Sequence, residues 1–186
     1  MKCSAFIAMS VDGYIATVDG GVDWLEEAGN SEVGDRPTVG DGGFADYLAS
    51  VDCMVMGRHC LEKIASFELT AEQWPYGDIP IFALSRTLTQ VPDALPGKVE
   101  IYSGEIPDLI SSLESESFTH AYVDGGATIT SFLRLGLLNE ICVTQVPLIL
   151  GDGLPLFGQI GKRIRLSEAE STTYSNDFIQ WKYRVG

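Results

Sequence analysis

The chain has 186 residues, of which 45% are hydrophobic, and its formal net charge at pH 7 is -14. This length and hydrophobic content exclude disordered and fibrous classes and predict one domain, spanning residues 1–186, that needs no disulfide or metal staple. The negative charge repels polyanions, so we expect no nucleic acid and no anionic membrane surface among its partners. A small-molecule substrate is the remaining expectation.

The cysteines and the N-terminal segment indicate the compartment. Cys3, Cys53, Cys60 and Cys142 have no C-x-x-C spacing, and we interpret them as free thiols that are kept reduced. The sequence contains no zinc-binding motif, so we predict no metal site. The N-terminal apolar run is too short for a signal peptide, and no run approaches membrane-spanning length. We therefore expect a cytoplasmic protein.

Short apolar runs bounded by Gly, Pro and Asp alternate with segments of helical periodicity, a pattern typical of α/β layering. The predicted strands are 2–9, 53–56, 79–84, 99–102, 120–123, 140–147, 163–174 and 178–185. The predicted helices are 43–50, 58–66, 105–114 and 128–135. This order predicts a three-layer α/β/α sandwich with a mixed, mostly parallel central sheet that ends in an antiparallel C-terminal hairpin, with its turn at 175–177.

The segment 17–43 departs from this alternation because it is rich in Gly, Asp and Glu. Asp23-Trp24-Leu25 is embedded in this segment, which we predict to be a long loop with one short helical piece; long loops inside a domain are often functional. Trp24 either stacks on a bound ring or pins the loop to the domain.

Four predicted strands stop at small or polar residues suited to ligand contact, at 10–13, 56–59, 84–87 and 123–126. In α/β sheets, ligands bind at the carboxyl ends of strands. We therefore expect these four strand ends to converge on one crevice.

Two of the strand ends carry arginine. Arg58 follows Gly57 at the start of a predicted helix, where a cation opposes the macrodipole unless an anion is bound; the alternative is a charged cap. Ser85 and Arg86 supply a hydroxyl and a planar set of donors suited to a phosphate monoester; the alternative is a solvated loop.

At another strand end the chain runs through Asp124-Gly125-Gly126 and restarts at once as a helix. The glycines either form a tight turn or let the backbone approach an anion at the helix N-terminus. Beside the two arginines, this turn predicts a dinucleotide with an additional phosphate. The usual G-x-G-x-x-G fingerprint and the G-x-S-x-G elbow are both absent, and the two histidines form no metal motif.

Five segments in order resemble the dihydrofolate reductase-like superfamily, in the branch of the riboflavin-biosynthesis reductase domain, the C-terminal domain of bifunctional deaminase-reductases. They are SVDGYIA, DWL, VDCMVMGRHCLEKI, PIFALSRTL and YVDGGATITSFLRLGLLNEICVTQVPLILGDGLPLF. The resemblance covers nearly the whole chain and implies an NADPH-dependent reductase acting on a small heterocycle of pyrimidine or pterin type. Two alternatives are the 5-amino-6-(5-phosphoribosylamino)uracil reductase itself and an NADP-binding module without turnover.

The resemblance also implies which residues bind the cofactor, around the pyrophosphate and the adenosine 2′-phosphate. They are Gly57, Arg58, His59, Cys60, Ser85, Arg86, Gly125, Gly126, Ala127 and Thr128. It further implies a cis peptide between the two adjacent glycines, a conformation that costs about 2.5–4 kcal/mol outside proline.

The chain departs from the family at three points. Cys60 stands where the family usually has Thr or Ser, and Asp124, a candidate substrate contact with Trp24, stands where riboflavin reductases tend to have Glu. The basic residues that bind the substrate's ribose phosphate in those enzymes are replaced mostly by Glu and Asp, which leaves Arg36 as the lone candidate.

Two acidic residues, or a bound water in their place, are candidates for the catalytic proton donor. Asp41 is the nearest counterpart by position to the acid that protonates the pterin in the folate enzymes, and its alternative role is to cap the following helix. Asp12 either donates a proton or caps its Asp-Gly turn.

The C-terminal strands carry more apolar and aromatic surface than an exposed sheet edge tolerates. The residues concerned are Ile164, Tyr174, Phe178, Ile179, Trp181 and Tyr183. We therefore expect a homodimer, or a helix that covers this edge.

Overall fold

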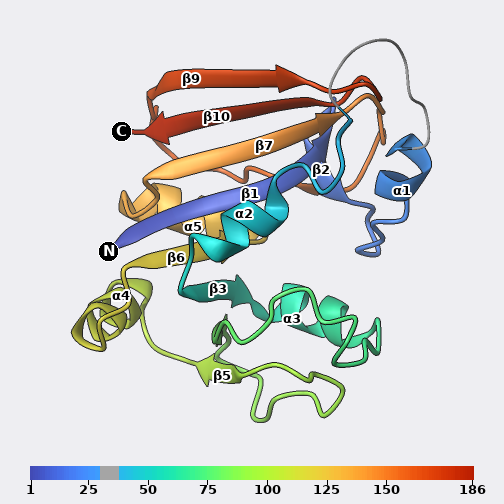
Figure 1. Ribbon diagram of the computed structural model, residues 1–186. Helices are drawn as coiled ribbons and strands as arrows, with labels where there is room; N and C mark the ends of the chain where they lie inside the picture. The colour runs from blue at the N-terminus through green and yellow to red at the C-terminus, as the bar shows by residue number, and fades with distance from the viewer. Residues whose placement is uncertain (30–37) are drawn as a thin grey trace.

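The computed structural model describes residues 1–29 and 38–186 (Figure 1). Within them, an eight-stranded sheet has the strand order β5-β4-β3-β6-β1-β7-β10-β9. The strands are β1 (Lys2–Ser10), β3 (Cys53–Gly57), β4 (Ile81–Leu84), β5 (Val99–Tyr102), β6 (His120–Asp124), β7 (Glu140–Val146), β9 (Leu166–Thr173) and β10 (Ile179–Val185).

Six neighbouring strands, from β5 to β7, are parallel, whereas β10 is antiparallel to β7 and β9 is antiparallel to β10. The β9–β10 turn closes where the Tyr174 N–H donates to the Phe178 carbonyl over 2.9 Å. The predicted mixed sheet and its C-terminal hairpin are thus confirmed.

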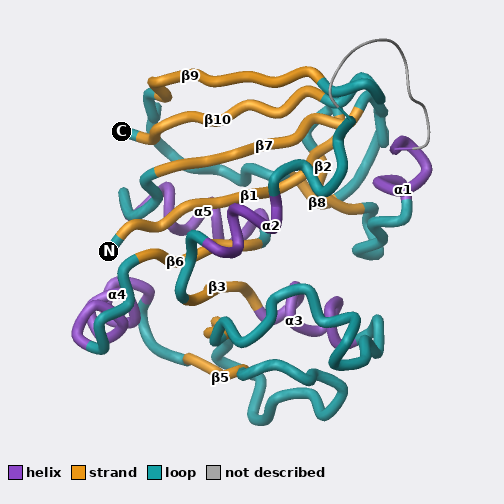
Figure 2. The backbone as a smooth tube through the Cα atoms, in the orientation of Figure 1, coloured by secondary structure: helices purple, strands orange, loops and turns teal. Residues whose placement is uncertain are grey.

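Helices cover both faces of this sheet (Figure 2). On one face, α2 (Phe44–Ala49) and α3 (Arg58–Ala65) pack against Met54, Met56 and Tyr122, and on the other face α4 (Ile106–Ser115) and α5 (Gly126–Leu135) pack against Val55, Val123 and Val143. Because successive strand side chains point to opposite faces, the continuous apolar run of β3 requires a helical layer on each side. The α/β/α prediction is confirmed.

The structure adds elements that the sequence pattern missed. A second sheet pairs β2 (Tyr14–Ala16) with β8 (Leu154–Pro155); strands of three and two residues are too short to show alternation. Helix α5 begins at Gly126, two residues before its predicted start, whereas α1 (Trp24–Gly29) is the short helical piece predicted in the long loop.

The cysteines are free, as expected, and burial raises the pKa of the Cys53 thiol to about 12. Within residues 1–29 and 38–186, no helix has both the length and the apolar character needed to cross a bilayer. The same residues contain no grouping of His, Cys, Asp and Glu suited to hold a metal ion.

Candidate active site

The four strand ends singled out by the sequence lie side by side. Strands β4, β3, β6 and β1 are adjacent and parallel, so their carboxyl ends meet at one edge of the sheet. The register places Gly57 beside Leu84 and Met56 beside Asp124. The predicted convergence follows from this topology, and no single motif would have established it.

Asp124, the last residue of β6, is half-buried in this edge. Desolvation raises the pKa of its carboxyl to about 6, against the opposing effect of hydrogen bonds from the Gly125 N–H and the Tyr122 hydroxyl. Tyr122 Oη donates to the Phe6 carbonyl over 2.9 Å and lies 3.4 Å from Asp124 Oδ1. A carboxyl with this pKa exchanges protons near neutral pH.

Tyr122, the aromatic neighbour of this carboxyl group, belongs to a cluster of aromatic rings. The Tyr122 ring lies edge-on to Tyr47 and Phe44, with centroid separations of 5.1 and 6.3 Å, and Phe6 stacks on Tyr47 at 4.9 Å. Burial and then the charge of Asp124 raise the pKa of Tyr76. This end of β6 thus combines an apolar environment with one titratable acid, Asp124.

The structure explains the two adjacent glycines by steric crowding. Gly125 has a φ of +88°, and a Cβ there would meet the Cys60 sulfur; a Cβ on Gly126 would meet the Pro155 carbonyl. No cis peptide occurs within residues 1–29 and 38–186, so the predicted cis bond between these glycines is wrong. Close packing of α3 and β8 against the turn is sufficient to require glycine at both positions.

Two helix N-termini meet at the Gly125-Gly126 turn, since α3 starts at the end of β3 and α5 starts after the adjacent strand β6. A Cβ on Gly57 would lie 3.2 Å from Thr128 Oγ1, so the first turns of the two helices are in contact. Thr128 is buried, whereas Ala127 is exposed. Unpaired N–H groups at such ends favour anions.

Arg58 and His59 open α3. The Arg58 guanidinium donates to Glu62 Oε1 over 2.8 Å and lies 3.3 Å from His59 Nε2. The His59 side chain is 82% exposed. The Arg58 cation at the start of α3 is therefore paired with the Glu62 carboxylate, one turn further along the same helix.

Ser85 and Arg86 follow β4. Ser85 Oγ accepts from the Leu88 N–H over 2.8 Å, which caps the turn, while Arg86 pairs with Glu105 at the start of α4. The Arg86 side chain is 73% exposed. Its guanidinium thus lies just beyond the carboxyl end of β4 and is accessible to a ligand.

The two candidate proton donors both cap backbone N–H groups. Asp41 accepts from Gly43 and Ala45 at the start of α2, over 3.0 and 2.8 Å, and these bonds lower the pKa of its carboxyl. Asp12 accepts from the Ser10 hydroxyl over 2.6 Å and from Gly151 N–H, and its pKa is lowered too. The geometry supports the helix-capping alternative for Asp41. Asp12 instead accepts from the Leu150 and Gly151 N–H groups of a distant loop and not from its own Asp-Gly turn.

A model of the RibD C-terminal domain matches residues 2–180. The chain belongs to this family. The predicted resemblance to the reductase domain of the riboflavin-biosynthesis deaminase-reductases is therefore confirmed at the level of the family.

Similar proteins agree with this assignment. The uncharacterized protein YwjB of Bacillus subtilis (strain 168) is 28% identical over 167 residues, covering 89% of this chain and 87% of YwjB. A crystal structure of a Shewanella sp. PV-4 protein, provisionally assigned to riboflavin biosynthesis, has 36% identity and a TM-score of 0.87, covering 100% and 99% of the two chains. Dihydrofolate reductase from Enterococcus faecalis, at 9% identity and a TM-score of 0.63 over 100% and 96%, shares the fold.

Trp24, a candidate substrate contact, lies in a small apolar cluster with Val146 and Phe178 and is only 5% exposed. Its indole therefore pins α1 to the end of the sheet and offers almost no surface to a stacked ring. Arg36, the candidate phosphate ligand, lies outside the described residues.

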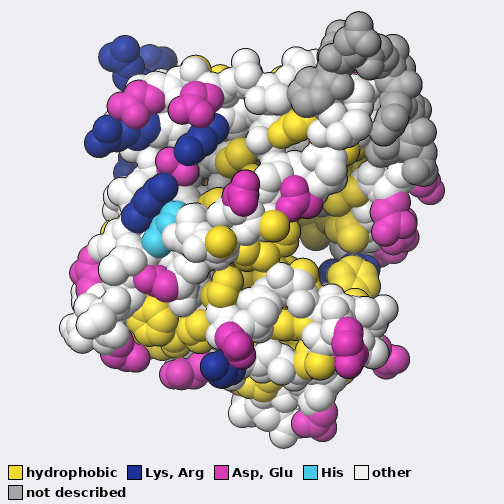
Figure 3. Space-filling model, in the orientation of Figure 1, with side chains coloured by type: hydrophobic (Ala, Val, Ile, Leu, Met, Phe, Trp, Pro, Cys, Tyr) yellow, Lys and Arg dark blue, Asp and Glu magenta, His cyan; other side chains and the backbone are white. Residues whose placement is uncertain are grey.

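A cavity of about 580 Å³, which sequence reasoning missed, lies beside this cluster. Strand β1 contributes Phe6 and Ala8, β7 contributes Thr144, and the turn before α2 contributes Asp41. Figure 3 shows hydrophobic side chains exposed in a hollow on this face, with Asp and Glu side chains around it. Of these residues only Asp41 was a candidate from the sequence; Phe6, Ala8 and Thr144 carried no sequence signal, because only the pairing of β1 with β7 brings them together.

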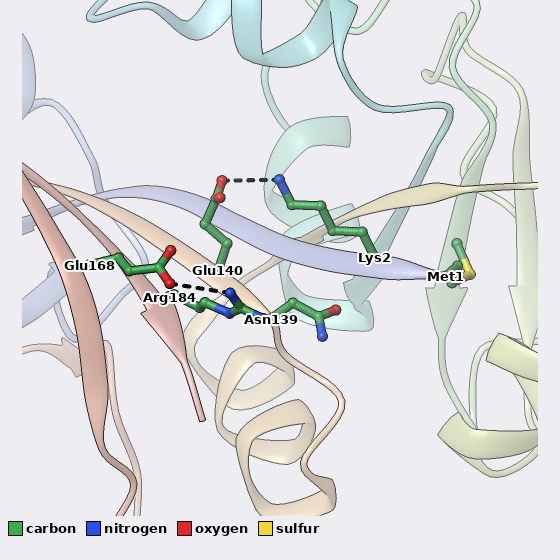
Figure 4. Close-up of a pocket in the computed structure, with 6 residues that line it drawn as sticks. All are labelled: Met1, Lys2, Asn139, Glu140, Glu168 and Arg184. Atoms are coloured by element: carbon green, nitrogen blue, oxygen red, sulfur yellow. Dashed lines mark hydrogen bonds and ion pairs between the residues drawn. The ribbon is translucent and has the colours of Figure 1, made fainter.

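A second cavity, of about 440 Å³, opens at the opposite edge of the sheet. Its charged groups pair with one another: Lys2 Nζ lies 3.2 Å from Glu140, and Arg184 lies 3.2 Å from Glu168 (Figure 4). This cavity contains none of the predicted site residues.

Proposed function

We propose that the protein is an NADPH-dependent reductase that transfers a hydride to a small heterocyclic substrate of pyrimidine or pterin type. The observation that carries the proposal is the convergence of four parallel strand ends that present two helix N-termini, two guanidinium groups and one carboxyl with a raised pKa. Membership in the RibD C-terminal domain family supports the same class of reaction.

The donors at this edge fit a phosphorylated dinucleotide. The first turns of α3 and α5 have N–H groups without an intrahelical partner, and Arg58 and Arg86 supply positive charge at the ends of β3 and β4. The glutamates that pair with these arginines form solvent-accessible ion pairs, which typically contribute about 0–1 kcal/mol and exchange readily for a phosphate. NADPH, when bound, supplies the hydride.

Asp124 is the group that we propose as proton donor. Its carboxyl is partly protonated near neutral pH because burial raises its pKa to about 6, and the Tyr122 hydroxyl lies close enough to orient it. Asp12 and Asp41 suit this role less well, because hydrogen bonds hold their carboxylates ionised.

The uracil reductase of riboflavin biosynthesis is the second candidate, since the family match favours it. A binding module without turnover is the third. Oxidation of NADPH with any acceptor would exclude the binding module without turnover. Which acceptor is reduced would distinguish the two reductase candidates.

The first test is a fluorescence titration with NADPH and with NADH, repeated with Arg86→Ala. We expect NADPH to bind more tightly than NADH and to lose about 10–100-fold in affinity in the variant, because a charge-assisted hydrogen bond is worth about 1.5–3 kcal/mol. Arg184→Ala is the matched control, because Arg184 is 67% exposed and also paired with a glutamate, but lies at the opposite edge. Absence of NADPH binding, or equal losses in both variants, would contradict the cofactor assignment.

The second test concerns the proton donor. We expect Asp124→Asn to reduce kcat by about 10²–10⁴-fold while NADPH affinity is retained, since general acid catalysis typically contributes that much. In the unsubstituted protein, kcat should fall as the pH rises above about 6, because the donor must be protonated. Asp12→Asn and Asp41→Asn are the comparison variants; a larger loss in either would return the role to that residue.

A further inference from the structure

Asp12 makes contacts that the proposed reaction does not use. Its carboxylate accepts from the Leu150 N–H over 3.1 Å and from the Gly151 N–H over 2.7 Å. The Ser10 hydroxyl donates to the same carboxylate over 2.6 Å, which fixes its orientation just beyond the end of β1. Both N–H donors belong to residues 148–159, called here the connecting segment, which leads from β7 through β8 toward β9. Asp12 thus joins the end of β1 to a segment far along the chain.

Backbone hydrogen bonds hold the same connecting segment to the residues on either side of Asp12. The Val11 N–H donates to the Leu148 carbonyl over 2.8 Å. The Leu156 N–H donates to the Gly13 carbonyl over 2.9 Å. Between these two bonds, β8 pairs with β2 in the small second sheet. The connecting segment is therefore fixed before and after β8, and the Asp12 carboxylate holds the turn that leads into it.

The connecting segment also packs along α5. A Cβ on Gly126 would lie 2.4 Å from the Pro155 carbonyl oxygen, so the backbone of β8 is in close contact with the first residue of the helix. The Gly158 N–H donates to Thr130 Oγ1 over 2.9 Å. Gly126 and Thr130 are four residues apart and therefore lie on the same face of the helix. The segment that Asp12 holds is thus packed against the N-terminal half of α5.

We propose that Asp12 is a positioning residue for the cofactor site, which acts through the connecting segment on the first turn of α5. This inference rests on the proposed function, in which that turn binds the pyrophosphate of NADPH. The N–H groups of a helix start bind an anion more tightly when they are held in the bound geometry before the ligand arrives. Without the bonds to Leu150 and Gly151, β8 would not be held as closely against Gly126, and nucleotide binding would have to order this turn.

Nucleotide titration of Asp12→Ala tests this role, because the pyrophosphate is common to NADPH and NADH. We expect the affinity for both nucleotides to fall about tenfold, the equivalent of one hydrogen bond to the pyrophosphate, with the NADPH-to-NADH ratio unchanged. Arg86→Ala should instead lower that ratio. Asp12→Asn should show a smaller loss than Asp12→Ala, because its amide oxygen can still accept from Ser10 and Leu150 and only the bond from Gly151 is lost.

Asp52→Ala is the matched control. Asp52 also joins two distant segments, since its carboxylate accepts from the Thr119 N–H over 2.7 Å and from the His120 N–H over 3.0 Å. These bonds lie at the amino ends of β3 and β6, at the opposite edge of the sheet from the strand ends of the proposed cofactor site. We expect Asp52→Ala to leave the affinities for both nucleotides unchanged.

Amide hydrogen exchange of the nucleotide-free protein, measured by NMR, reports the positioning without a ligand. The Ile129 N–H donates to the Gly125 carbonyl over 2.9 Å in the first turn of α5, and the Leu156 N–H reports the connecting segment. Relative to the amides of β3, we expect Asp12→Ala to speed exchange of both by about the factor lost in nucleotide affinity, because each measures how often this turn leaves the binding geometry. Asp52→Ala should leave both relative rates unchanged.

The outcomes separate this inference from the proposed function. Unchanged affinity for both nucleotides in Asp12→Ala, or an equal loss in Asp52→Ala, overturns the inference and leaves the reductase in place. A fall in kcat with unchanged affinity also overturns it, because that result identifies Asp12 as the proton donor. If the parent protein binds neither nucleotide, the reductase proposal fails; faster exchange of Ile129 in Asp12→Ala then supports the positioning of α5, and an unchanged rate overturns it.

Discussion

Asp124 combines the properties that make a residue useful in catalysis and costly for stability. Its carboxyl lies half-buried among aromatic rings, accepts a hydrogen bond from Gly125 N–H and has a pKa raised from 3.8 to about 6. The raised pKa means that the folded state disfavours the ionised form. Ionisation at neutral pH therefore destabilises the fold, in the manner expected of a functional acid.

We expect Asp124→Asn to stabilise the protein at pH 8 by about 2–3 kcal/mol, because each pKa unit corresponds to about 1.36 kcal/mol and the amide carries no charge. For a raised pKa, the native-state advantage is complete below the unfolded value near 3.8 and is lost as the pH rises through about 6. The difference between variant and parent should accordingly vanish below pH 4. Urea unfolding of variant and parent at pH 4 and at pH 8 measures the two stability differences. A variant that is less stable than the parent at pH 8 would contradict the argument that burial disfavours the ionised carboxyl.

Helix α2, β1 and β6 are joined at the other end of the sheet by a buried hydrogen-bond network. Ser4 Oγ lies 2.8 Å from Tyr47 Oη and 2.7 Å from His120 Nε2, and His120 Nδ1 donates to the Ser50 carbonyl over 2.7 Å. Burial lowers the pKa of His120, against the opposing effect of the bond to Ser50. The network therefore requires a neutral imidazole that accepts from the Ser4 hydroxyl.

Acidification should loosen this end of the molecule. Because the folded pKa of His120 lies below the unfolded value of 6.5, the contribution to stability is complete above pH 6.5 and is lost as the pH falls toward the folded pKa. We expect the free energy of unfolding to decrease as the pH falls below about 6.5, and His120→Gln to remove that decrease. His59→Gln replaces an exposed imidazole and serves as the control; an unchanged slope in His120→Gln would show that another group is responsible.

The apolar strand β10 is not an exposed edge of the sheet, which differs from the expectation drawn from the sequence. Strand β10 lies between β7 and β9, and its Trp181 and Tyr183 pack against the main core. The edge strand on this side of the sheet is β9, which carries Glu168 and Glu170, and charged residues discourage edge-to-edge pairing. Covering of β10 by β9 thus removes the original reason for expecting a dimer.

A homodimer stays a prediction on different grounds, because several large apolar side chains are exposed near the carboxyl edge, among them Val11 and Ile149, which is 71% exposed. Sedimentation equilibrium should give twice the chain mass of 20.2 kDa. We expect Ile149→Asp to shift this toward the single-chain mass, whereas Leu135→Asp, at the far end of α5, should not. A single-chain mass for the unsubstituted protein would exclude the dimer.

The sequence by itself determined the order of the eight main-sheet strands and the helices between them, the layered class and the four strand ends, because alternation, helical periodicity and glycine or arginine at strand ends are local properties of the chain. It also offered the alternatives that the geometry supports for Asp41, as a helix cap, and for Trp24, as the residue that pins the loop. Only the tertiary structure decided that Cys60 and Pro155 crowd the two glycines, that Asp124 is desolvated, and that β1 beside β7 creates a cavity. Each of these depends on contacts between residues far apart in sequence, which no local pattern records.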